Sequence, residues 1–148
     1  MYCLAKESKT LDVNSCYHYL LLCRHFAKTS MVAVHEENVV GFVTGYIPPE
    51  ESGTLFIWQV TVASPFRGKG LALGMLESLV HTLEHDRLSY LDTTITPDNE
   101  ASIHLFTALS KRLGKPHTFN EIFFSEDQFG ESGHMAEMLF RIGPGLHS

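Results

Sequence analysis

The sequence contains no apolar run that approaches the roughly 20 residues of a membrane-spanning helix. Its first ten residues include no long apolar stretch, which argues against a secretory signal. Basic residues are few: Lys and Arg number 11 against 17 Asp and Glu, and the formal net charge is −6. Nucleic acids and anionic membranes bind clustered Lys and Arg, so we expect neither as the main partner. The acidic balance favours a cationic substrate, but only weakly.

Cysteine is also scarce, with Cys3, Cys16 and Cys23. Cys16 and Cys23 lie seven residues apart, which on a helix is one face but too far for a disulfide bond. We therefore expect reduced thiols in a cytoplasmic protein. The nine histidines include His81 and His85 on an expected helix, but the segment His-Thr-Leu-Glu-His lacks the glutamate position of a zinc protease. A solvated helix face explains this pair, and no metal site is expected.

The remaining composition fits one globular domain. The chain has 148 residues, of which 44% are apolar and 19% are charged, as in folded domains with their own core. No repeat, low-complexity tract or long linker divides it. We therefore expect residues 1–148 to form a single domain.

The apolar periodicity predicts alternating helices and strands. Helices are expected at residues 14–28, 71–85 and 99–113, and strands at 31–35, 39–47, 55–62, 88–95, 117–124 and 135–142. The order is helix, three strands, helix, strand, helix and two strands. This order predicts an α/β fold in which helices cover the faces of a mixed sheet.

The most informative segment joins the strand that ends at Val62 to the helix that starts at Leu71. Between them, Arg67-Gly68-Lys69-Gly70 forms a short basic loop. Glycines let the backbone approach a ligand closely, and the first turn of a helix leaves N–H groups unpaired. Together with the helix dipole, these groups form an anion site that suits a pyrophosphate.

The spacing excludes two other phosphate-binding loops. A Walker loop requires G-x-x-x-x-G-K-S/T, which the segment lacks. A Rossmann fingerprint requires G-x-G-x-x-G, but the position of its third glycine after Gly68 and Gly70 is Leu73. For this loop taken alone, an ordinary helix N-terminus with glycine in a tight turn remains the alternative.

The segment Arg67-Gly68-Lys69-Gly70-Leu71-Ala72 resembles the Q/R-x-x-G-x-G/A loop of the GNAT acetyltransferases, which binds the pyrophosphate of coenzyme A. The resemblance implies acetyl-CoA as cosubstrate and a GNAT fold, with a mixed central sheet, helices on both faces and a splayed pair of cofactor-binding strands. In that family, one strand of the pair runs along the pantetheine arm, and an Asn-led helix borders the thiol end. The cofactor-binding residues that it implies are Val60, Thr61, Val62, Arg67, Gly68, Lys69, Gly70, Leu71, Ala72, Asn99, Ser102 and Phe106.

Longer segments are similar to the diaminobutyrate acetyltransferase family of ectoine biosynthesis. They are Thr10-Leu11-Asp12-Val13-Asn14-Ser15, Phe56-Ile57-Trp58-Gln59-Val60, Thr93-Thr94-Ile95-Thr96-Pro97-Asp98-Asn99-Glu100-Ala101-Ser102 and Leu139-Phe140-Arg141-Ile142-Gly143-Pro144. This resemblance spans about residues 11–144. It implies acetylation of the 4-amino group of L-2,4-diaminobutyrate by a homodimer. Members of the family begin with a further strand and most of a first helix, and we expect the first strand to be missing here.

A diamino acid presents two cations and one carboxylate, so acidic groups should orient it. The resemblance points to Asp12 and Glu137, although Asp12 could instead cap the first helix and Glu137 could be a solvent-facing strand residue. Trp58 is expected to wall the substrate pocket, and a core tryptophan is the alternative. Tyr17 and His134 are further candidates for the substrate end, although each alone is better explained as structural.

Two details of the site stay open at this level. His134 and Glu137 are three residues apart, so a regular strand would point them to opposite faces. Either a bulge or turn lies between them, or one of the two is outside the site. Many GNAT members carry a tyrosine as general acid where this chain has Phe106, so the proton must come from another group or from water.

Three other functions remain. The chain could be a GNAT enzyme for another amine, such as a polyamine or a protein N-terminus. It could be a non-catalytic acetyl-CoA-binding module. A plain α/β interaction domain is the third, and it leaves the basic loop unexplained.

Overall fold

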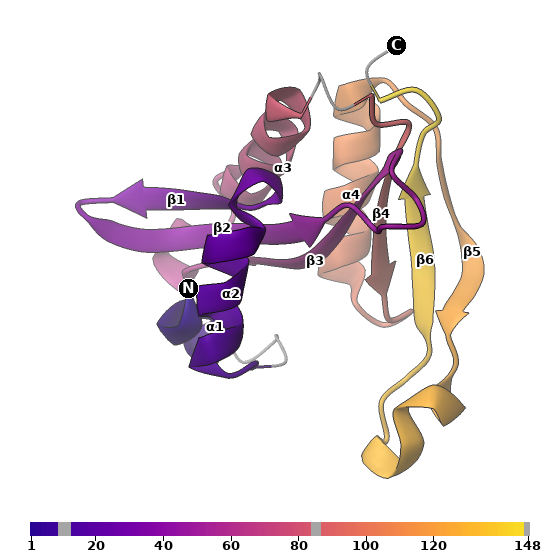
Figure 1. The fold of residues 1–148 in the computed structure, drawn as a ribbon, viewed down its shortest axis with the longest axis horizontal. Coiled ribbons are helices and arrows are strands. Elements are labelled where there is room, and N and C mark those ends of the chain that lie inside the picture. The colour runs from indigo at the N-terminus through magenta and orange to yellow at the C-terminus, as the bar shows by residue number, and fades with distance from the viewer. Residues whose placement is uncertain (9–12, 84–86, 147–148) are drawn as a thin grey trace.

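A six-stranded mixed sheet in the order β1-β2-β3-β4-β6-β5 forms the centre of the computed structural model, which describes residues 1–8, 13–83 and 87–146. The strands are β1 (Met31–His35), β2 (Asn38–Tyr46), β3 (Thr54–Val62), β4 (Tyr90–Ile95), β5 (His117–Phe124) and β6 (Glu137–Ile142). The helices are α1 (Tyr2–Ser8), α2 (Cys16–His25), α3 (Leu71–Thr82) and α4 (Glu100–Leu113), with short 3-10 segments η1 (Ala27–Thr29), η2 (Ser64–Phe66) and η4 (Glu126–Ser132). In Figure 1, α1 and α2 lie on the near face of the sheet, and α3 and α4 lie on the far face. This arrangement confirms the predicted fold class.

The expected helices and strands are present, with ends that differ by a few residues. The strand expected from Leu88 begins at Tyr90, and the first expected helix ends at His25, before a 3-10 turn. Asp12 and His85 lie outside the described residues. The short helix α1 was not predicted, because seven residues are too few to show a helical period. Such a short helix depends on tertiary packing, which Leu4 and Ala5 provide against α2.

Apolar side chains pack on both faces of the sheet, and neighbouring residues of β2 illustrate the division. Phe42 is buried against α1 and α2, and Val43 is buried in the larger core on the side of α3 and α4. Successive residues of a strand point to opposite faces, so each face acquires its own apolar cluster. Helix α2 is thereby held in place beside β2 and β3, where the site lies.

Strands β3 and β4 separate partway along their length (Figure 1). Their parallel pairing joins Thr54–Ile57 to Tyr90–Thr93 and ends there, while β3 stays paired with β2 as far as Val62 and β4 stays paired with β6 as far as Ile95. The sheet is therefore open between β3 and β4 at this end, as predicted for a splayed strand pair.

Trp58 is an extra residue in β3 at the point where the two strands part. The register on β2 advances from Thr44 to Gly45 while that on β3 advances from Gln59 to Ile57, so Trp58 has no partner residue. A β-bulge of this kind bends the strand and re-aims a side chain.

Strand β6 is fixed to β4 by an ion pair on the face opposite α4. Arg141 Nε and Nη2 donate to the two carboxylate oxygens of buried Asp92 at 2.8 and 2.6 Å. The hydrogen bonds to Asp92 raise the pKa of the Arg141 guanidinium above its ordinary value. The pair holds β6 in register, and Glu137 is the first residue of that strand.

Among the helices described, none has the length and apolar character needed to cross a membrane.

Candidate active site

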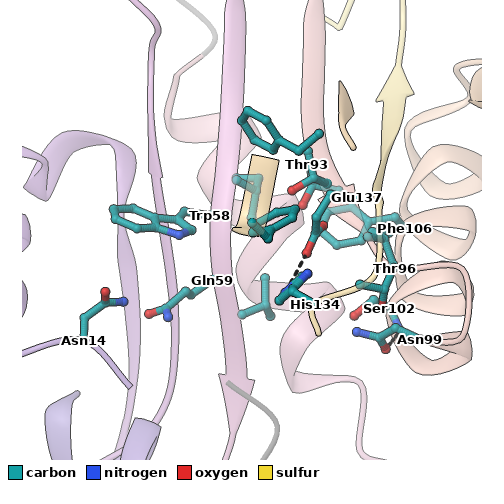
Figure 2. A pocket seen from close by; sticks show the side chains of 16 residues that line it. Asn14, Trp58, Gln59, Thr93, Thr96, Asn99, Ser102, Phe106, His134 and Glu137 are labelled. Atoms are coloured by element: carbon teal, nitrogen blue, oxygen red, sulfur yellow. Dashed lines mark hydrogen bonds and ion pairs between the residues drawn. The ribbon is translucent and has the colours of Figure 1, made fainter. Parts of the chain in front are cut away.

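A cavity of about 430 Å³ occupies the opening between β3 and β4. Its walls come from β3, β4, the first turns of α4, the segment before α2, and the chain between β5 and β6 (Figure 2). The described lining residues are Asn14, Ile57, Trp58, Gln59, Val60, Thr93, Thr94, Ile95, Thr96, Asn99, Ser102, Phe106, Phe124, Phe129, His134 and Glu137. The site therefore assembles residues from almost the whole length of the chain.

His134 and Glu137 both face the cavity, and the dashed line in Figure 2 joins them. His134 Nε2 lies 3.6 Å from Glu137 Oε1. Strand β6 begins only at Glu137, so His134 belongs to an irregular segment. The alternation of side-chain directions along a strand therefore does not apply to it. Both side chains therefore line the cavity, because an irregular segment and not a regular strand lies between them.

The other ring nitrogen of His134 determines what Nε2 can do. His134 Nδ1 lies 2.7 Å from the carbonyl oxygen of Met135, and a carbonyl oxygen can only accept. Nδ1 therefore carries a proton, and in the neutral ring Nε2 offers a lone pair. Stacking of the ring on Phe129, with centroids 4.2 Å apart, fixes its plane. When the ring is neutral, its Nε2 presents an acceptor to the cavity.

Glu137 adds further acceptors in the same place. Its Oε2 atom is buried and has no hydrogen-bond partner among the described residues. A buried carboxylate oxygen without a donor is costly, because desolvation is not repaid. Among the described lining residues there is no Lys, Arg or Asp, so this carboxylate is the fixed charge of the cavity. The arrangement suits a ligand that brings N–H donors and positive charge.

Trp58 lines the cavity and is 46% exposed, so the alternative of a core tryptophan is wrong. Tyr17, by contrast, is 68% exposed and is not among the lining residues. The structure thus brings together Trp58, His134 and Glu137, and it leaves Tyr17 apart on the surface of α2. Asp12, the remaining candidate at the substrate end, lies outside the described residues.

The first turns of α4 close the cavity on a further side. The side-chain oxygen of Asn99 accepts a hydrogen bond from the Ser102 backbone N–H at 3.1 Å, which caps the helix. Phe106 is buried and packs on Phe140, with ring centroids 5.9 Å apart. The position at which many GNAT members carry a tyrosine therefore offers no hydroxyl to the cavity.

The basic loop forms a second, smaller hollow of about 220 Å³ at the start of α3. Gly68 and Gly70 have φ values of +71° and +77°, and Gly70 is the N-cap of α3 without a side-chain cap. Glycine adopts this left-handed backbone without strain, and the uncapped first turn leaves N–H groups for an anion. The predicted residues that line the hollow are Val62, Arg67, Gly68, Gly70, Leu71 and Ala72.

The other six predicted cofactor residues lie outside this hollow: Asn99, Ser102, Phe106 and Val60 line the central cavity, and Lys69 and Thr61 line neither. The Lys69 ammonium sits over the ring of Phe66, 5.5 Å from its centroid, and is not in the lining of the hollow. Thr61 is buried in β3, and Val60 lines the central cavity. Arg67 is held by a hydrogen bond of 2.9 Å from its Nε to the carbonyl oxygen of Val62, which ties the loop to the end of β3.

Several lining residues were not predicted from the sequence. Asn14 stands at the expected start of the first helix, but Ser15 caps that helix and Asn14 lines the cavity. Thr94 and Thr96 belong to a segment that carried the family resemblance, which was the one signal for them. Phe129 comes from η4, a polar and glycine-containing stretch in which no periodic pattern marks an inward-facing ring.

The described residues contain no group of three or more His, Cys, Asp or Glu side chains that could hold a metal ion.

Comparison with known proteins places this geometry in a family. The model of the Acetyltransferase (GNAT) family matches residues 1–110. An L-2,4-diaminobutyric acid acetyltransferase of Marinococcus halophilus is 46% identical over 144 residues, which cover 97% of this chain and 83% of that protein. One from Streptomyces anulatus is 46% identical over 143 residues, covering 95% and 81%.

A solved structure is similar over the same range. It is the diaminobutyrate acetyltransferase EctA from Paenibacillus lautus in complex with its substrate L-2,4-diaminobutyric acid and coenzyme A. The TM-score is 0.90 at 36% sequence identity, and the match covers 97% of this chain and 86% of that chain.

The unpaired oxygen of Glu137 predicts that this residue lowers the stability of the ligand-free protein. In the wild-type protein, Glu137 Oε1 faces His134 Nε2, and both atoms accept when the ring is neutral. In Glu137→Gln, the side-chain amide N–H₂ can instead donate a hydrogen bond to Nε2. We expect the free energy of unfolding to rise by about 1 kcal/mol, measured by urea denaturation without ligands. Glu121→Gln changes an exposed acid on β5 and should leave stability unchanged. A destabilised Glu137→Gln protein would indicate a protonated His134 that is ion-paired with Glu137, and would contradict the acceptor arrangement.

Proposed function

The chain belongs to the GNAT acetyltransferase family, and we propose that it transfers the acetyl group of acetyl-CoA to the 4-amino group of L-2,4-diaminobutyrate. The product is N4-acetyl-L-2,4-diaminobutyrate, and the reaction is the acetylation step of ectoine biosynthesis. The observation that carries the proposal is the acceptor pair of Glu137 and His134 in the cavity between the splayed strands. An alkylammonium group brings N–H donors and a positive charge, which complement these acceptors and the negative charge of Glu137.

The two hollows are joined through β3, which supports one extended ligand site. Val60 lines the central cavity, and Val62 lines the hollow of the basic loop two residues further along. Residues two apart on a strand share a face, so both hollows open on the same side of β3. The loop amides suit the pyrophosphate of coenzyme A, and the thioester is then carried along β3 toward Glu137.

The chemical difficulty is the proton on the amine. An alkylammonium group with a pKa near 10 is only about one part in a thousand neutral at pH 7, a handicap of roughly 4 kcal/mol. His134 Nε2 and Glu137 are the acceptors at the end of the cavity that can take this proton. Holding the amine between them also restricts its orientation toward the thioester carbon.

Once neutral, the amine nitrogen attacks the thioester carbonyl carbon. The intermediate loses a second N–H proton to water, and the C–S bond breaks as the intermediate collapses to the amide and the thiolate. A backbone N–H of β3 near Val60 is suited to the oxyanion, because β4 does not pair with β3 there. The departing thiolate has a pKa near 8.5, so it leaves without obligatory protonation and can take its proton from water. This chemistry is compatible with Phe106 in place of a tyrosine acid.

We assign the predicted residues to this reaction as follows. Asp12 and Glu137 bind the cationic groups of the substrate, His134 assists Glu137, and Trp58 walls the pocket. Tyr17 is kept as a substrate-side candidate on the family resemblance, although in this structure it lies outside the cavity. The coenzyme is bound by Val60, Thr61, Val62, Arg67, Gly68, Lys69, Gly70, Leu71, Ala72, Asn99, Ser102 and Phe106.

We also propose that the chain is a single-domain cytoplasmic protein that works as a homodimer. The exposed thiols of Cys3, Cys16 and Cys23 suit a reducing compartment. The edge strand β5 supports self-association, because Ile122, Phe123 and Phe124 are all exposed on it. An open edge with apolar side chains is a ready surface for pairing.

The substrate assignment predicts a clear order of preference. Thiol release from acetyl-CoA should be fastest with L-2,4-diaminobutyrate and at least tenfold slower with ornithine, lysine or spermidine, because a longer chain misplaces the amine relative to Glu137. Chromatography of the product should resolve the 4-acetyl from the 2-acetyl isomer and find the former. Faster thiol release with another amine would show that diaminobutyrate is not the preferred substrate. Cofactor binding without thiol release would indicate a non-catalytic module.

The acid assignment predicts a selective loss of amine binding. Asp12→Asn and Glu137→Gln should each raise the KM for diaminobutyrate or reduce turnover by at least tenfold, since each removes a charge that faces an ammonium group. Acetyl-CoA affinity, measured by calorimetry, should stay within twofold of wild type. Glu121→Gln serves as the matched exposed control. Normal amine kinetics in both variants would remove these acids from the site.

The dimer assignment predicts a particle of about twice the chain mass of 16.6 kDa in light scattering. Phe123→Lys and Ile122→Lys place charges on the exposed edge and should shift the particle toward the monomer. A wild-type protein that is monomeric at micromolar concentration would reject the assignment.

A further inference from the structure

His18 in the first turns of α2 makes a contact that the proposed reaction does not use. Its ring meets the indole of Trp58 edge-to-face, with centroids 4.6 Å apart and an interplanar angle of 83°. Its Nε2 atom is buried and has no hydrogen-bond partner among the described residues. The imidazole also contacts the ring of Tyr19, with centroids 5.4 Å apart and an interplanar angle of 86°.

The perpendicular arrangement of the two rings is a favourable one. In such a contact the positive edge of one aromatic ring meets the negative face of the other. Tyr19 is itself buried and donates a hydrogen bond of 3.0 Å to Gln59 Oε1, so the support behind His18 is rigid. His18 is therefore a rigidly held residue of α2 that contacts the side chain of Trp58.

Trp58 is a side chain that needs such support. It is the bulged residue of β3, and the β4 pairing has ended one residue earlier, at Ile57. Its indole is 46% exposed, and Figure 2 shows it projecting from β3 on the side away from Glu137. Without a neighbour to hold it, a half-exposed side chain at a bulge can change rotamer freely.

The orientation of Trp58 matters because the indole borders two cavities. A third hollow, of about 410 Å³, adjoins the substrate cavity, and Trp58, Thr94 and Phe124 line both. This third hollow is apolar and aromatic, with Phe26, Tyr46, Phe56 and Phe123 in its walls. Burial raises the pKa of the Tyr46 hydroxyl, so that this wall stays uncharged. The indole thus stands between a polar hollow with a carboxylate and an apolar one.

We propose that His18 is a positioning residue that holds the Trp58 indole as the partition between these two hollows, and thereby limits the length of amine that the site accepts. The proposal rests on the diaminobutyrate acetyltransferase activity proposed above. With the partition in place, the substrate cavity ends at the indole and suits a short diamino acid. With the indole displaced, the cavity extends into the aromatic hollow, where the methylene chain of a longer amine can be buried.

The chain offers a direct probe, because Trp58 is its single tryptophan. His18→Ala removes the support, and His18→Phe keeps a ring for edge-to-face packing. His25→Ala is the matched control: the same change in the last turn of the same helix, at an exposed histidine. Circular dichroism of each variant verifies that α2 and the sheet are retained.

We expect three changes in His18→Ala. Quenching of Trp58 fluorescence by acrylamide should rise about twofold, since a contact that shields the indole is lost. The KM for diaminobutyrate should rise about fivefold with kcat and the KM for acetyl-CoA unchanged, because the partition contacts the amine substrate alone. The preference in kcat/KM for diaminobutyrate over lysine should fall about fivefold. His18→Phe should show less than half of each change, and His25→Ala none.

The outcomes separate the two proposals. The positioning role would be overturned if His18→Ala shows the same acrylamide quenching as wild type, or the same KM for diaminobutyrate and the same amine preference. It would also be overturned if the KM for acetyl-CoA rises as much as the KM for diaminobutyrate. If His18→Ala does not fold, His18→Phe decides by the same measurements, with a change in quenching and amine KM beyond that of His25→Ala as the supporting result. A wild-type protein that does not acetylate diaminobutyrate would reject the proposed reaction, while the fluorescence comparison still tests whether His18 holds Trp58.

Discussion

The separation of β3 from β4 after Ile57 and Thr93 is the constraint on which the rest of the site depends. Within a sheet, backbone N–H and C=O groups are normally satisfied by the neighbouring strand. Where these two strands part, the facing groups of β3 have no strand to pair with, and a ligand with amide groups along its length can take that place. The same opening creates the cavity that exposes Glu137, and the bulge at Trp58 turns the strand at its mouth. The end of hydrogen bonding between β3 and β4 therefore provides both a strand edge along which an extended coenzyme can bind and a pocket for an amine.

The electrostatics of the cavity complement this geometry. Glu137 is half-buried, one of its oxygens has no hydrogen-bond partner among the described residues, and His134 Nε2 lies 3.6 Å from the other oxygen. Such a cluster costs stability in the empty protein and is relieved by a ligand that brings donors. The hollow at the start of α3 has the opposite character, with unpaired backbone N–H groups and the guanidinium of Arg67. The chain thus separates an anion-binding end from a cation-binding end along a single strand, which is what a reaction between an anionic coenzyme and a cationic amine requires.

The order of elements and the basic loop could be predicted from the sequence, because hydrophobic period and glycine placement are local signals. The splayed pair came from family resemblance, since nothing in the composition of β3 or β4 says where pairing stops. His134 and Glu137 looked incompatible on a regular strand, and only the irregular segment before β6 reconciles them. Phe129 and His18 were not predicted at all: one sits in an aperiodic loop, and the other acts through a ring contact between α2 and β3. Contacts between distant segments leave no trace in local patterns, and the substrate end of this site consists mainly of such contacts.

The place of β6 within the sheet has a consequence for how the site is assembled. Among the described strands, β5 pairs only with β6, so these two strands join β4 as one hairpin, and the segment that links them carries Phe129 and His134. Glu137 arrives with the same hairpin, whereas the loop at 67–72 belongs to the opposite half of the molecule. Release of this hairpin would remove Glu137 and His134 from the amine pocket. Phe140 and Ile142 of β6 lie in the same apolar core as Leu76 and Leu79 of α3, so the strand that carries the amine-binding acid and the helix that follows the basic loop are packed together through one core.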